Sequence, residues 1–385
     1  MIATPQSCQE LLAHMVGFDT VVAYHSGVAE AERKLSDYLA GLATAWGFTV
    51  RELPIEGACG NLLIEHCIDP TLPWLMFDSH MDTVGVEGMT IDPFGGEIRD
   101  GRLYGRGACD TKGTGAAMLW ALREYAAGSQ KPRNIAVLFS VGEEHVQTGA
   151  RAFVEQHLAL LDWTPAGVVA GEPTQMQVLG ATGGFVRWKM TTLGQACHSS
   201  KPDRGHNAIY DMARLVTALE DDYIGKIRAT HPLVGNASAA ITVINGGKQV
   251  NVVPAEATIT FDRRLVPGED GQRELNAVQA LAAQVAASRP GMQVTHHQFE
   301  SAPPMGTVDG GQFANQAVTA LEGVGISSEV AGEPFTTNGN HFAAAGIPTI
   351  VVGPGDIAQA HTPDEWVSLE ELDRGIAGYA AIMKS

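Results

Sequence analysis

The sequence predicts an α/β protein that carries a second, inserted α+β domain, and three observations support this fold class. Short apolar runs alternate with helical segments in the first third of the chain, an alternation typical of α/β folds with partly parallel sheets. Further along, the order changes to strand–helix–strand–strand–helix–strand, which is the ferredoxin-like arrangement. The length of 385 residues suffices for two or three domains at roughly 150 residues each.

Five apolar runs in the α/β part have the length of strands and are bounded by Gly, Pro or polar residues. They are residues 61–64, 74–77, 135–139, 167–170 and 348–352. Because these runs are almost continuously apolar, they suit interior strands covered on both faces. Helical spacing places Leu35, Leu39 and Leu42 on one face of a predicted helix over 29–46. The segment from Gly113 to Ala126 is expected to be a helix that connects two parallel strands.

The inserted domain is predicted over residues 183–295, and the first domain over 1–182 and 296–385. Strands are expected at 185–190, 239–244, 257–261 and 293–297, and helices at 207–223 and 272–288. Polar and apolar residues alternate from Phe185 to Met190, as in a strand with one solvated face. The chain is expected to return to the first domain near Pro303.

Composition argues against two classes of partner and indicates a cellular compartment. The formal net charge is −18, which disfavours binding to nucleic acid or to an anionic membrane surface. The five cysteines form no CxxC pair, so a reducing compartment is expected. The N-terminus has no basic segment before an apolar stretch, and no apolar run approaches the ~18–20 residues that span a bilayer. We therefore expect a cytoplasmic protein.

Ionisable residues at the ends of the apolar runs indicate the chemistry. They are His80 and Asp82 after 74–77, Glu143 and Glu144 after 135–139, Glu172 after 167–170, His361 after 348–352, and Asp110 before the helix at 113. Ligands of parallel α/β sheets bind beyond the carboxyl ends of the strands, so these side chains are expected to converge. A cluster of five carboxylates and two imidazoles needs a countercharge, which divalent metal ions supply. His and carboxylate ligands suit zinc, with cobalt or manganese as alternatives.

A site with two metal ions lowers the pKa of bound water, and a nearby carboxylate that binds no metal can act as general base. Of the adjacent residues Glu143 and Glu144, one could bind metal while the other faces the substrate. His80 and Asp82 are two residues apart, so in extended backbone they share a face. Asp82 could therefore orient a metal-bound His80.

Five segments occur in this order along the chain: SHMDTV, GRGACDTKG, GEEH, GEPT and AHTPDEW. In combination they resemble the M20 metallopeptidase family of dinuclear zinc amidohydrolases, and the resemblance covers nearly the whole chain. Residues 352–365 are most similar to the branch of acetylornithine deacetylases and succinyl-diaminopimelate desuccinylases. The resemblance implies a zinc-peptidase-like α/β/α catalytic domain, and it makes the insertion a lid and dimerisation domain.

The resemblance also implies roles for the residues at the strand ends. One metal ion would be held by His80, Asp110 and Glu172, and the other by Asp110, Glu144 and His361. In the family pattern Glu143 is the general base and then the acid toward the leaving amine, and Asp82 orients His80. The peptide bond after Asp110 is often cis in the family.

Three residues of the inserted domain match family positions that act on the substrate. His198, in ACHSS, would reach across a homodimer to stabilise the oxyanion. Asn251 and Arg264 would contact the substrate carboxylate, a task for which the planar guanidinium of arginine is well suited. The chain departs from many relatives at Thr336–His341, where they carry an acidic Gly-Thr-Asp-type segment. This loop is expected to line the substrate pocket, and no role follows from the sequence for His341.

The sequence leaves three functions open. The first is removal of an acyl group from an N-acyl amino acid by a dinuclear metal-dependent hydrolase. The second is a dipeptidase or carboxypeptidase with the same metal core, since both reactions hydrolyse an amide beside a carboxylate. The third is a catalytically silent scaffold, which predicts loss of the base or of several ligands, whereas none is missing from this chain. The expected partners are a small N-acyl amino acid or short peptide and a second copy of the chain.

Overall fold

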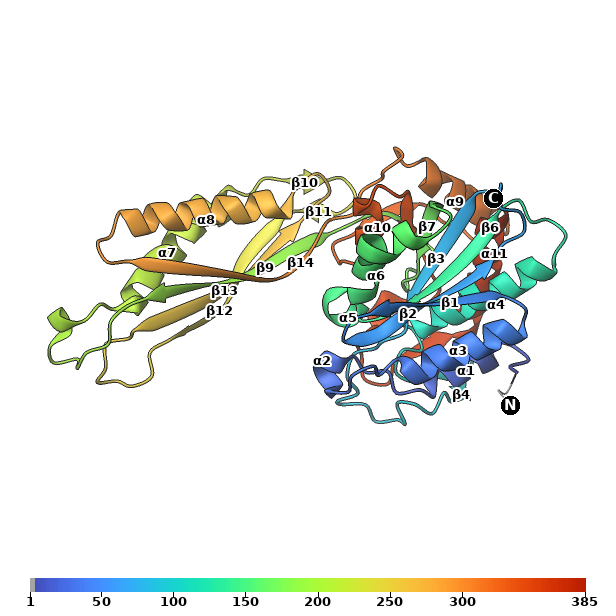
Figure 1. Cartoon of the computed structure of the whole chain (residues 1–385), viewed down its shortest axis with the longest axis horizontal. Coiled ribbons are helices and arrows are strands. Elements are labelled where there is room, and N and C mark those ends of the chain that lie inside the picture. The colour runs from blue at the N-terminus through green and yellow to red at the C-terminus, as the bar shows by residue number, and fades with distance from the viewer. Residues whose placement is uncertain (1–3) are drawn as a thin grey trace. The chain divides into compact units, whose positions relative to one another are not determined.

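The computed structural model describes residues 4–385, and the chain folds into two compact units (Figure 1). The first unit comprises the residues up to Ala181 together with Gly306–Gly332 and Thr337–Ser385. The second comprises Thr182–Met305 and Glu333–Thr336. The sequence placed the end of the insertion at residue 295, but the last strand of the second unit continues to Ala302. The second unit therefore ends later than expected, at Met305.

An eight-stranded sheet forms the centre of the first unit. Its order is β1 (Thr49–Ile55), β2 (Ala58–His66), β6 (Asn134–Ser140), β3 (Trp74–His80), β7 (Pro165–Ala170), β16 (Thr349–Val351), β8 (Val178–Thr182) and β15 (Val330–Glu333). The pairs β6–β3, β3–β7 and β7–β16 are parallel, whereas β1–β2, β2–β6 and β16–β8 are antiparallel. The four central strands therefore end at the same edge of the sheet.

Helices cover both faces of this sheet, so the first unit has three layers (Figure 1). Leu75 and Phe77 of β3 enter one hydrophobic core, and Trp74 and Met76 enter the core on the opposite face. This alternation explains why the strand is apolar throughout. The first core includes side chains of α1 (Cys8–Val16), α3 (Arg33–Ala45), α4 (Lys112–Ala127), α9 (Gln312–Glu322) and α11 (Leu369–Lys384). The second includes side chains of α6 (Thr148–Ala152) and α10 (Gly339–Ala344). The predicted α/β fold is confirmed.

The sequence did not reveal the outer strands β1, β8 and β15. Strand β1 buries one residue fully, Leu53, and exposes much of the rest. Strand β8 contains Gly180, and β15 is four residues long. None of them has the continuous apolar run that marks a central strand. A small sheet of β17 (Trp366–Ser368), β5 (Arg102–Tyr104) and β4 (Ile98–Arg99) and the short helices α2 (Ala23–Ser26) and α5 (Glu143–Val146) complete the first unit.

The second unit is a four-stranded antiparallel sheet with two helices on one face. The sheet order is β12 (Ser238–Gly246), β13 (Glu256–Leu265), β9 (Gly184–Leu193) and β14 (Gln293–Ala302), and the helices are α7 (Ala208–Asp222) and α8 (Gly271–Ala287). Trp188 and Phe261 stack in its core, with ring centroids 4.5 Å apart. The element order along the chain is that of the predicted ferredoxin-like arrangement. The short strands β10 (Thr230–His231) and β11 (Gly235–Asn236) pair with each other.

Candidate metal centre

Two groups of metal-ligating side chains lie at the carboxyl edge of the central strands. His80, Asp110 and Glu172 form one group, and Asp110, Glu144 and His361 form the other. Within each group the ligand atoms lie within 4.8 Å of one another. These are the two sets of three that the sequence analysis assigned to two ions.

Asp110 belongs to both groups and offers a different oxygen to each histidine. Nε2 of His80 lies 3.1 Å from Asp110 Oδ1, and Nε2 of His361 lies 3.3 Å from Oδ2. Nε2 of His361 is also 2.9 Å from Glu144 Oε2. His80 is the last residue of β3, and Asp110 directly precedes the turn into α4. The local fold therefore brings two histidines from separate parts of the chain to the carboxylate of Asp110, which both groups contain.

The electrostatics of the cluster fit bound cations. Burial and the charge of Asp110 raise the pKa of Glu172 well above its usual value. Burial raises the pKa of Glu143 to about 8; the charge of His80 opposes this rise, and the charges of Glu144, Asp82 and Asp110 add to it. Carboxylates crowd here with too few positive groups to compensate them. Two divalent ions on this His and carboxylate donor set would restore the balance.

Asp82 fixes the backbone that carries the adjacent glutamates. Its fully buried carboxylate accepts the N–H of Glu143 at Oδ1 and that of Glu144 at Oδ2, both over 3.0 Å. Gly142, with φ +65°, makes the turn that precedes these amides, a conformation that glycine adopts without strain. Nδ1 of His80 approaches the Asp82 carbonyl more closely (2.9 Å) than the carboxylate (3.6 Å). Asp82 therefore contacts His80 through its backbone and holds the glutamates with its side chain.

The profile of peptidase family M20/M25/M40 matches residues 76–385. The chain belongs to this family. M20 members are metal-dependent hydrolases that act on amide or peptide bonds, and this chain is one of them. The peptide bond between Asp110 and Thr111 is cis.

Relatives found by sequence differ in their named activities, and solved structures share the fold. The chain is 28% identical to an acetylornithine deacetylase of Proteus mirabilis, and the alignment covers 94% of this chain and 92% of the relative. It is 26% identical to a probable carboxypeptidase of Aspergillus terreus, with 94% and 83% covered. An M20 family metallo-carboxypeptidase from Sulfolobus solfataricus has the same fold, with a TM-score of 0.81 at 17% identity and 99% of both chains covered. The Bacillus subtilis YXEP protein, a dinuclear metal-binding peptidase, gives a TM-score of 0.74 at 16% identity, with 99% of this chain and 98% of that chain covered.

One residue of this M20 hydrolase, Glu365, has a role that the sequence analysis did not assign. Its buried carboxylate accepts the backbone N–H groups of Gly107, Cys109 and Asp110 over 3.1, 2.8 and 2.9 Å. It also accepts Nη1 of Arg106 over 2.7 Å. Glu365 therefore holds the loop that delivers Asp110. Its position in AHTPDEW was the available signal, but spacing alone does not show its partners.

The Thr336–His341 segment of this M20 hydrolase also reaches the edge of the metal centre. Asn338 is buried, and its Nδ2 donates to Asp78 Oδ2 over 3.0 Å and to Ser140 Oγ over 2.9 Å. Asp78 lies in β3, and Ser140 is the last residue of β6. The segment is therefore anchored to two strands whose ends carry site residues.

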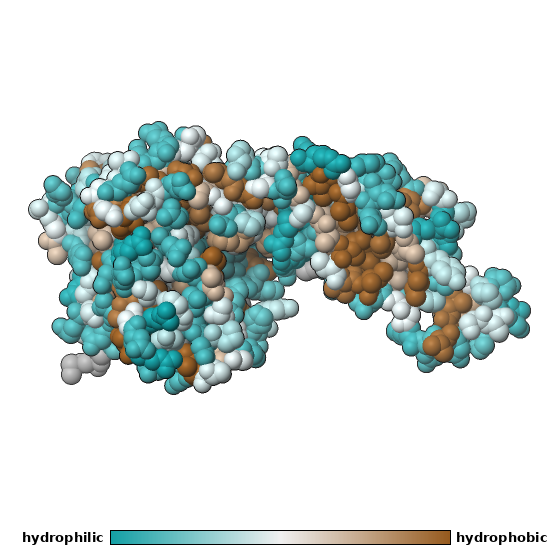
Figure 2. Space-filling model, turned by 180° about the vertical axis from the view of Figure 1, so that it is seen from behind, coloured by the Kyte–Doolittle hydropathy of each residue, from teal (hydrophilic) through white to brown (hydrophobic). Residues whose placement is uncertain are grey.

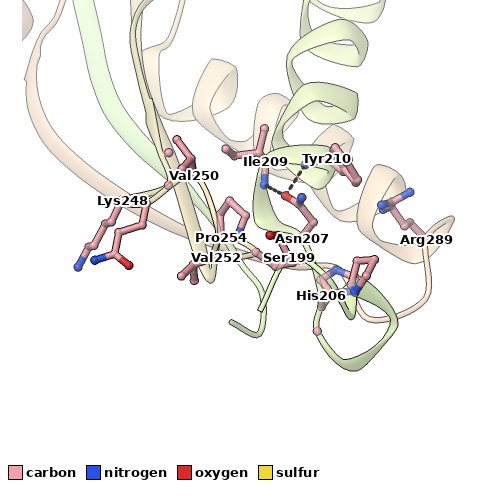
Figure 3. Close-up of a pocket in the computed structure, with 16 residues that line it drawn as sticks. Ser199, His206, Asn207, Ile209, Tyr210, Lys248, Val250, Val252, Pro254 and Arg289 are labelled. Atoms are coloured by element: carbon pink, nitrogen blue, oxygen red, sulfur yellow. Dashed lines mark hydrogen bonds between the residues drawn. The ribbon is translucent and has the colours of Figure 1, made fainter. Parts of the chain in front are cut away.

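His198 and Asn251 lie side by side in the second unit of this M20 hydrolase. The N–H of Ser199 donates to the carbonyl of Asn251 over 2.9 Å, and His198 forms a β-bridge with Val252. Both His198 and Asn251 are exposed. Ser199 and Val252 also line an open cavity of about 860 Å³ with His206 and Arg289 (Figure 3).

Arg264 lies at the other end of the same sheet. Asn251 lies in the connection between β12 and β13, close to the start of β13 at Glu256. Arg264 is eight residues beyond Glu256, which corresponds to roughly 27 Å along an extended strand. Within one chain, a small ligand cannot touch both Arg264 and Asn251. The sequence analysis assigned both to one substrate carboxylate without seeing this separation.

The two neighbouring arginines of β13 differ in environment. Arg264 is half-exposed, and its Nε donates to Asp262 Oδ1 over 2.7 Å. Arg263 is buried, and its Nη2 pairs with Glu269 Oε1 over 2.5 Å. Arg264 is thus the accessible one.

Among the described residues, no helix of this M20 hydrolase has the length and apolar character needed to cross a membrane.

Proposed function

We propose that this hydrolase removes the acyl group from the amino nitrogen of an N-acyl amino acid. The single observation that carries the proposal is the arrangement of Glu143 beside two metal-ligating groups that share Asp110. The 28% identity to acetylornithine deacetylases over nearly the whole chain favours this reaction class. Zinc is the proposed metal, because His and carboxylate ligands suit it, with cobalt or manganese as alternatives.

The proposed mechanism follows from the positions of the side chains. His80, Asp110 and Glu172 would hold one ion, and Asp110, Glu144 and His361 the other. When bound, two divalent ions lower the pKa of water and polarise an amide carbonyl. Glu143 belongs to neither metal-ligating group, so its carboxylate is free to take and return a proton. It accepts the proton of the attacking water as the new C–O bond forms, and it delivers that proton to the nitrogen as the C–N bond breaks.

We further propose that the active protein is a homodimer formed through the second unit. The substrate would contact Arg264 of one chain, while His198 and Asn251 come from the partner subunit. The separation of roughly 27 Å between the two ends of β13 supports this division, because a single chain cannot present all three residues to one small molecule.

The surface of the second unit supports such an interface. Strand β12 lies at the edge of its sheet, where unpaired backbone groups can extend the sheet into a second copy. Apolar side chains gather on this unit in Figure 2. Those that are exposed on or beside β12 include Val243, Ile244 and Val250, and Ile209 and Tyr210 are exposed on α7.

A cytoplasmic location stays a prediction.

The alternative function is that of a dipeptidase or carboxypeptidase. The relative named a probable carboxypeptidase, at 26% identity, favours it. The metal centre does not separate the two reactions, since each hydrolyses an amide close to a carboxylate. A silent scaffold has less support, because the ligands and the base are all present and both groups assemble.

A substrate panel measured together with metal content tests the proposal. The purified protein, with and without added Zn²⁺ or Co²⁺, is assayed on N-acetyl-L-ornithine, N-succinyl-diaminopimelate, other N-acyl amino acids and simple dipeptides. Metal-dependent deacylation with close to two ions per chain is expected. Preferential cleavage of dipeptides would favour the dipeptidase or carboxypeptidase function over deacylation. If the protein bound no metal and turned over no substrate, the hydrolase assignment of the centre would be refuted.

A further inference from the structure

A chain of two hydrogen bonds connects His341 to Glu143. Nε2 of His341 donates to Oε1 of Gln147 over 3.0 Å. Nε2 of Gln147 donates to Oε1 of Glu143 over 3.1 Å. The Gln147 amide thus accepts one hydrogen bond through its oxygen and donates one through its nitrogen. This connection joins Glu143, the proposed base, to the Thr336–His341 segment, in which the sequence departs from that of many relatives.

The geometry of Gln147 indicates that its side chain is placed for this contact. Gln147 lies between α5 and α6 and has φ +54°, a left-handed conformation that non-glycine residues adopt infrequently. Its side chain is nevertheless buried, at 5% exposure. A buried amide costs free energy unless its polar atoms are paired, and here His341 and Glu143 pair them.

His341 is suited to act as a permanent donor. It is buried in α10, and burial lowers its pKa to about 4, with a further contribution from the charge of Arg151. It is therefore neutral at ordinary pH, with the proton on Nε2 where Gln147 Oε1 accepts it. A neutral imidazole donates one hydrogen bond in a fixed direction. The segment that bears His341 is itself anchored through Asn338 to β3 and β6.

The remaining oxygen of Glu143 is left for chemistry. Oε1 of Glu143 receives the Gln147 amide, whereas Oε2 has no hydrogen-bond partner among the side chains and backbone that the structure describes. A carboxylate that is held at one oxygen keeps the other in a defined direction. Such preorganisation lowers the reorganisation needed in the transition state.

We propose that Gln147 and His341 are positioning residues for hydrolysis: His341 orients the Gln147 amide, and Gln147 holds Oε1 of Glu143 so that Oε2 faces the reacting groups. This inference rests on the proposed function, in which Glu143 moves the proton. It assigns the divergent segment a part in the reaction itself, in addition to any contact with the substrate.

Steady-state kinetics of the metal-loaded protein test the inference, with the best substrate of the panel. Gln147→Leu removes both polar atoms at similar size, and His341→Phe keeps a ring without the donor. We expect each to lower kcat about tenfold, which is the effect of roughly one hydrogen bond, with KM and metal content within about twofold of the unmodified protein. His341→Gln, which retains a donor, is expected to recover part of kcat relative to His341→Phe.

His157 provides a matched control. It is also buried, and its Nε2 donates to the backbone carbonyl of Pro54 over 2.9 Å. His157→Phe should lower thermal stability without changing kcat. If His341→Phe behaves like this control, or if its loss of turnover follows loss of metal, the positioning role is refuted.

The Glu143→Ala variant separates failure of this inference from failure of the proposed function. If Glu143→Ala is inactive but Gln147→Leu has full kcat, only the positioning role fails. If Glu143→Ala retains turnover, the base assignment fails and the positioning role fails with it. In the Glu143→Ala background, Gln147→Leu should leave the residual rate unchanged, since the carboxylate that it holds is gone.

Discussion

The backbone N–H of Asp110 donates to Oε1 of Glu365 over 2.9 Å. Glu365 follows His361 by four residues, so one short segment contributes a ligand to the second group and also holds the carboxylate that both groups share. The geometry of the metal centre is therefore coupled to the loop between β16 and β17.

We expect Glu365→Ala to weaken both folding and metal binding. The change leaves the buried guanidinium of Arg106 without its carboxylate, and loss of one partner from a buried pair costs about 3–5 kcal/mol. Urea unfolding and metal titration would measure the two effects. Glu97→Ala, which removes an exposed partner of Arg99, serves as control and should change stability by less than about 1 kcal/mol. Equal behaviour of the two variants would contradict the assigned role of Glu365.

Asp110→Ala should remove both metal ions, because Asp110 is a member of both groups. His361→Ala removes a ligand from the second group only, so it should retain the ion held by His80, Asp110 and Glu172. Metal content per chain after dialysis distinguishes them. A full complement of metal in Asp110→Ala would show that this carboxylate is not the shared ligand.

Glu143→Ala should retain metal and fold while turnover falls by about 10²–10⁴-fold, the contribution of a positioned general base. Glu143 is not a member of either metal-ligating group, so metal content provides the internal control. Unchanged kcat in this variant would remove Glu143 from the mechanism.

Mixing inactive subunits tests whether His198 acts across a dimer. His198→Ala and Glu143→Ala homodimers should each have low activity. After random exchange about half of the dimers are mixed, and each mixed dimer has one site with Glu143 from one chain and His198 from the partner. Activity should therefore recover to about one quarter of that of the unmodified protein. No recovery, with exchange verified by mass spectrometry, would place His198 and Glu143 of one chain in the same site.

Glu32 should make stability depend on pH. Burial raises its pKa to about 7, with the charge of Asp82 adding to the effect. The folded state thus binds the proton of Glu32 more tightly than the unfolded state does. Protonated Glu32 therefore adds to the free energy of unfolding, and this contribution is fully present below about pH 4.5 and is lost as the pH rises through 7. This contribution amounts to about 3 kcal/mol. Glu32→Gln, which cannot ionise, should gain stability relative to the unmodified protein between pH 4.5 and 8, measured by urea unfolding. A constant difference across this range would rule out the titration of Glu32 as its source.

The central strands could be predicted because their sequences carry the pattern locally. Leu75 and Met76 of β3 enter opposite cores, so the strand is apolar at successive positions and is recognisable without knowledge of its neighbours. Strand β1 was not predicted, because an edge strand with one buried residue has no such pattern. The end of the second unit was placed too early for a similar reason, since the residues of β14 beyond 297 do not indicate a strand.

The sequence by itself determined the fold class and the set of ionisable residues at the strand ends. Parallel strands end at one edge, so His80, Glu143 and Glu172 had to approach one another once the strands were known. Only the tertiary structure decided which atoms meet. Gln147 and His341 are 194 positions apart, and Asp110 and Glu365 are 255 apart. Contacts over such separations depend on how layers pack and on which way loops turn, and local spacing does not encode either. The separation of Arg264 from Asn251 likewise required the full extent of β13, which runs as one extended strand from Glu256 to Leu265.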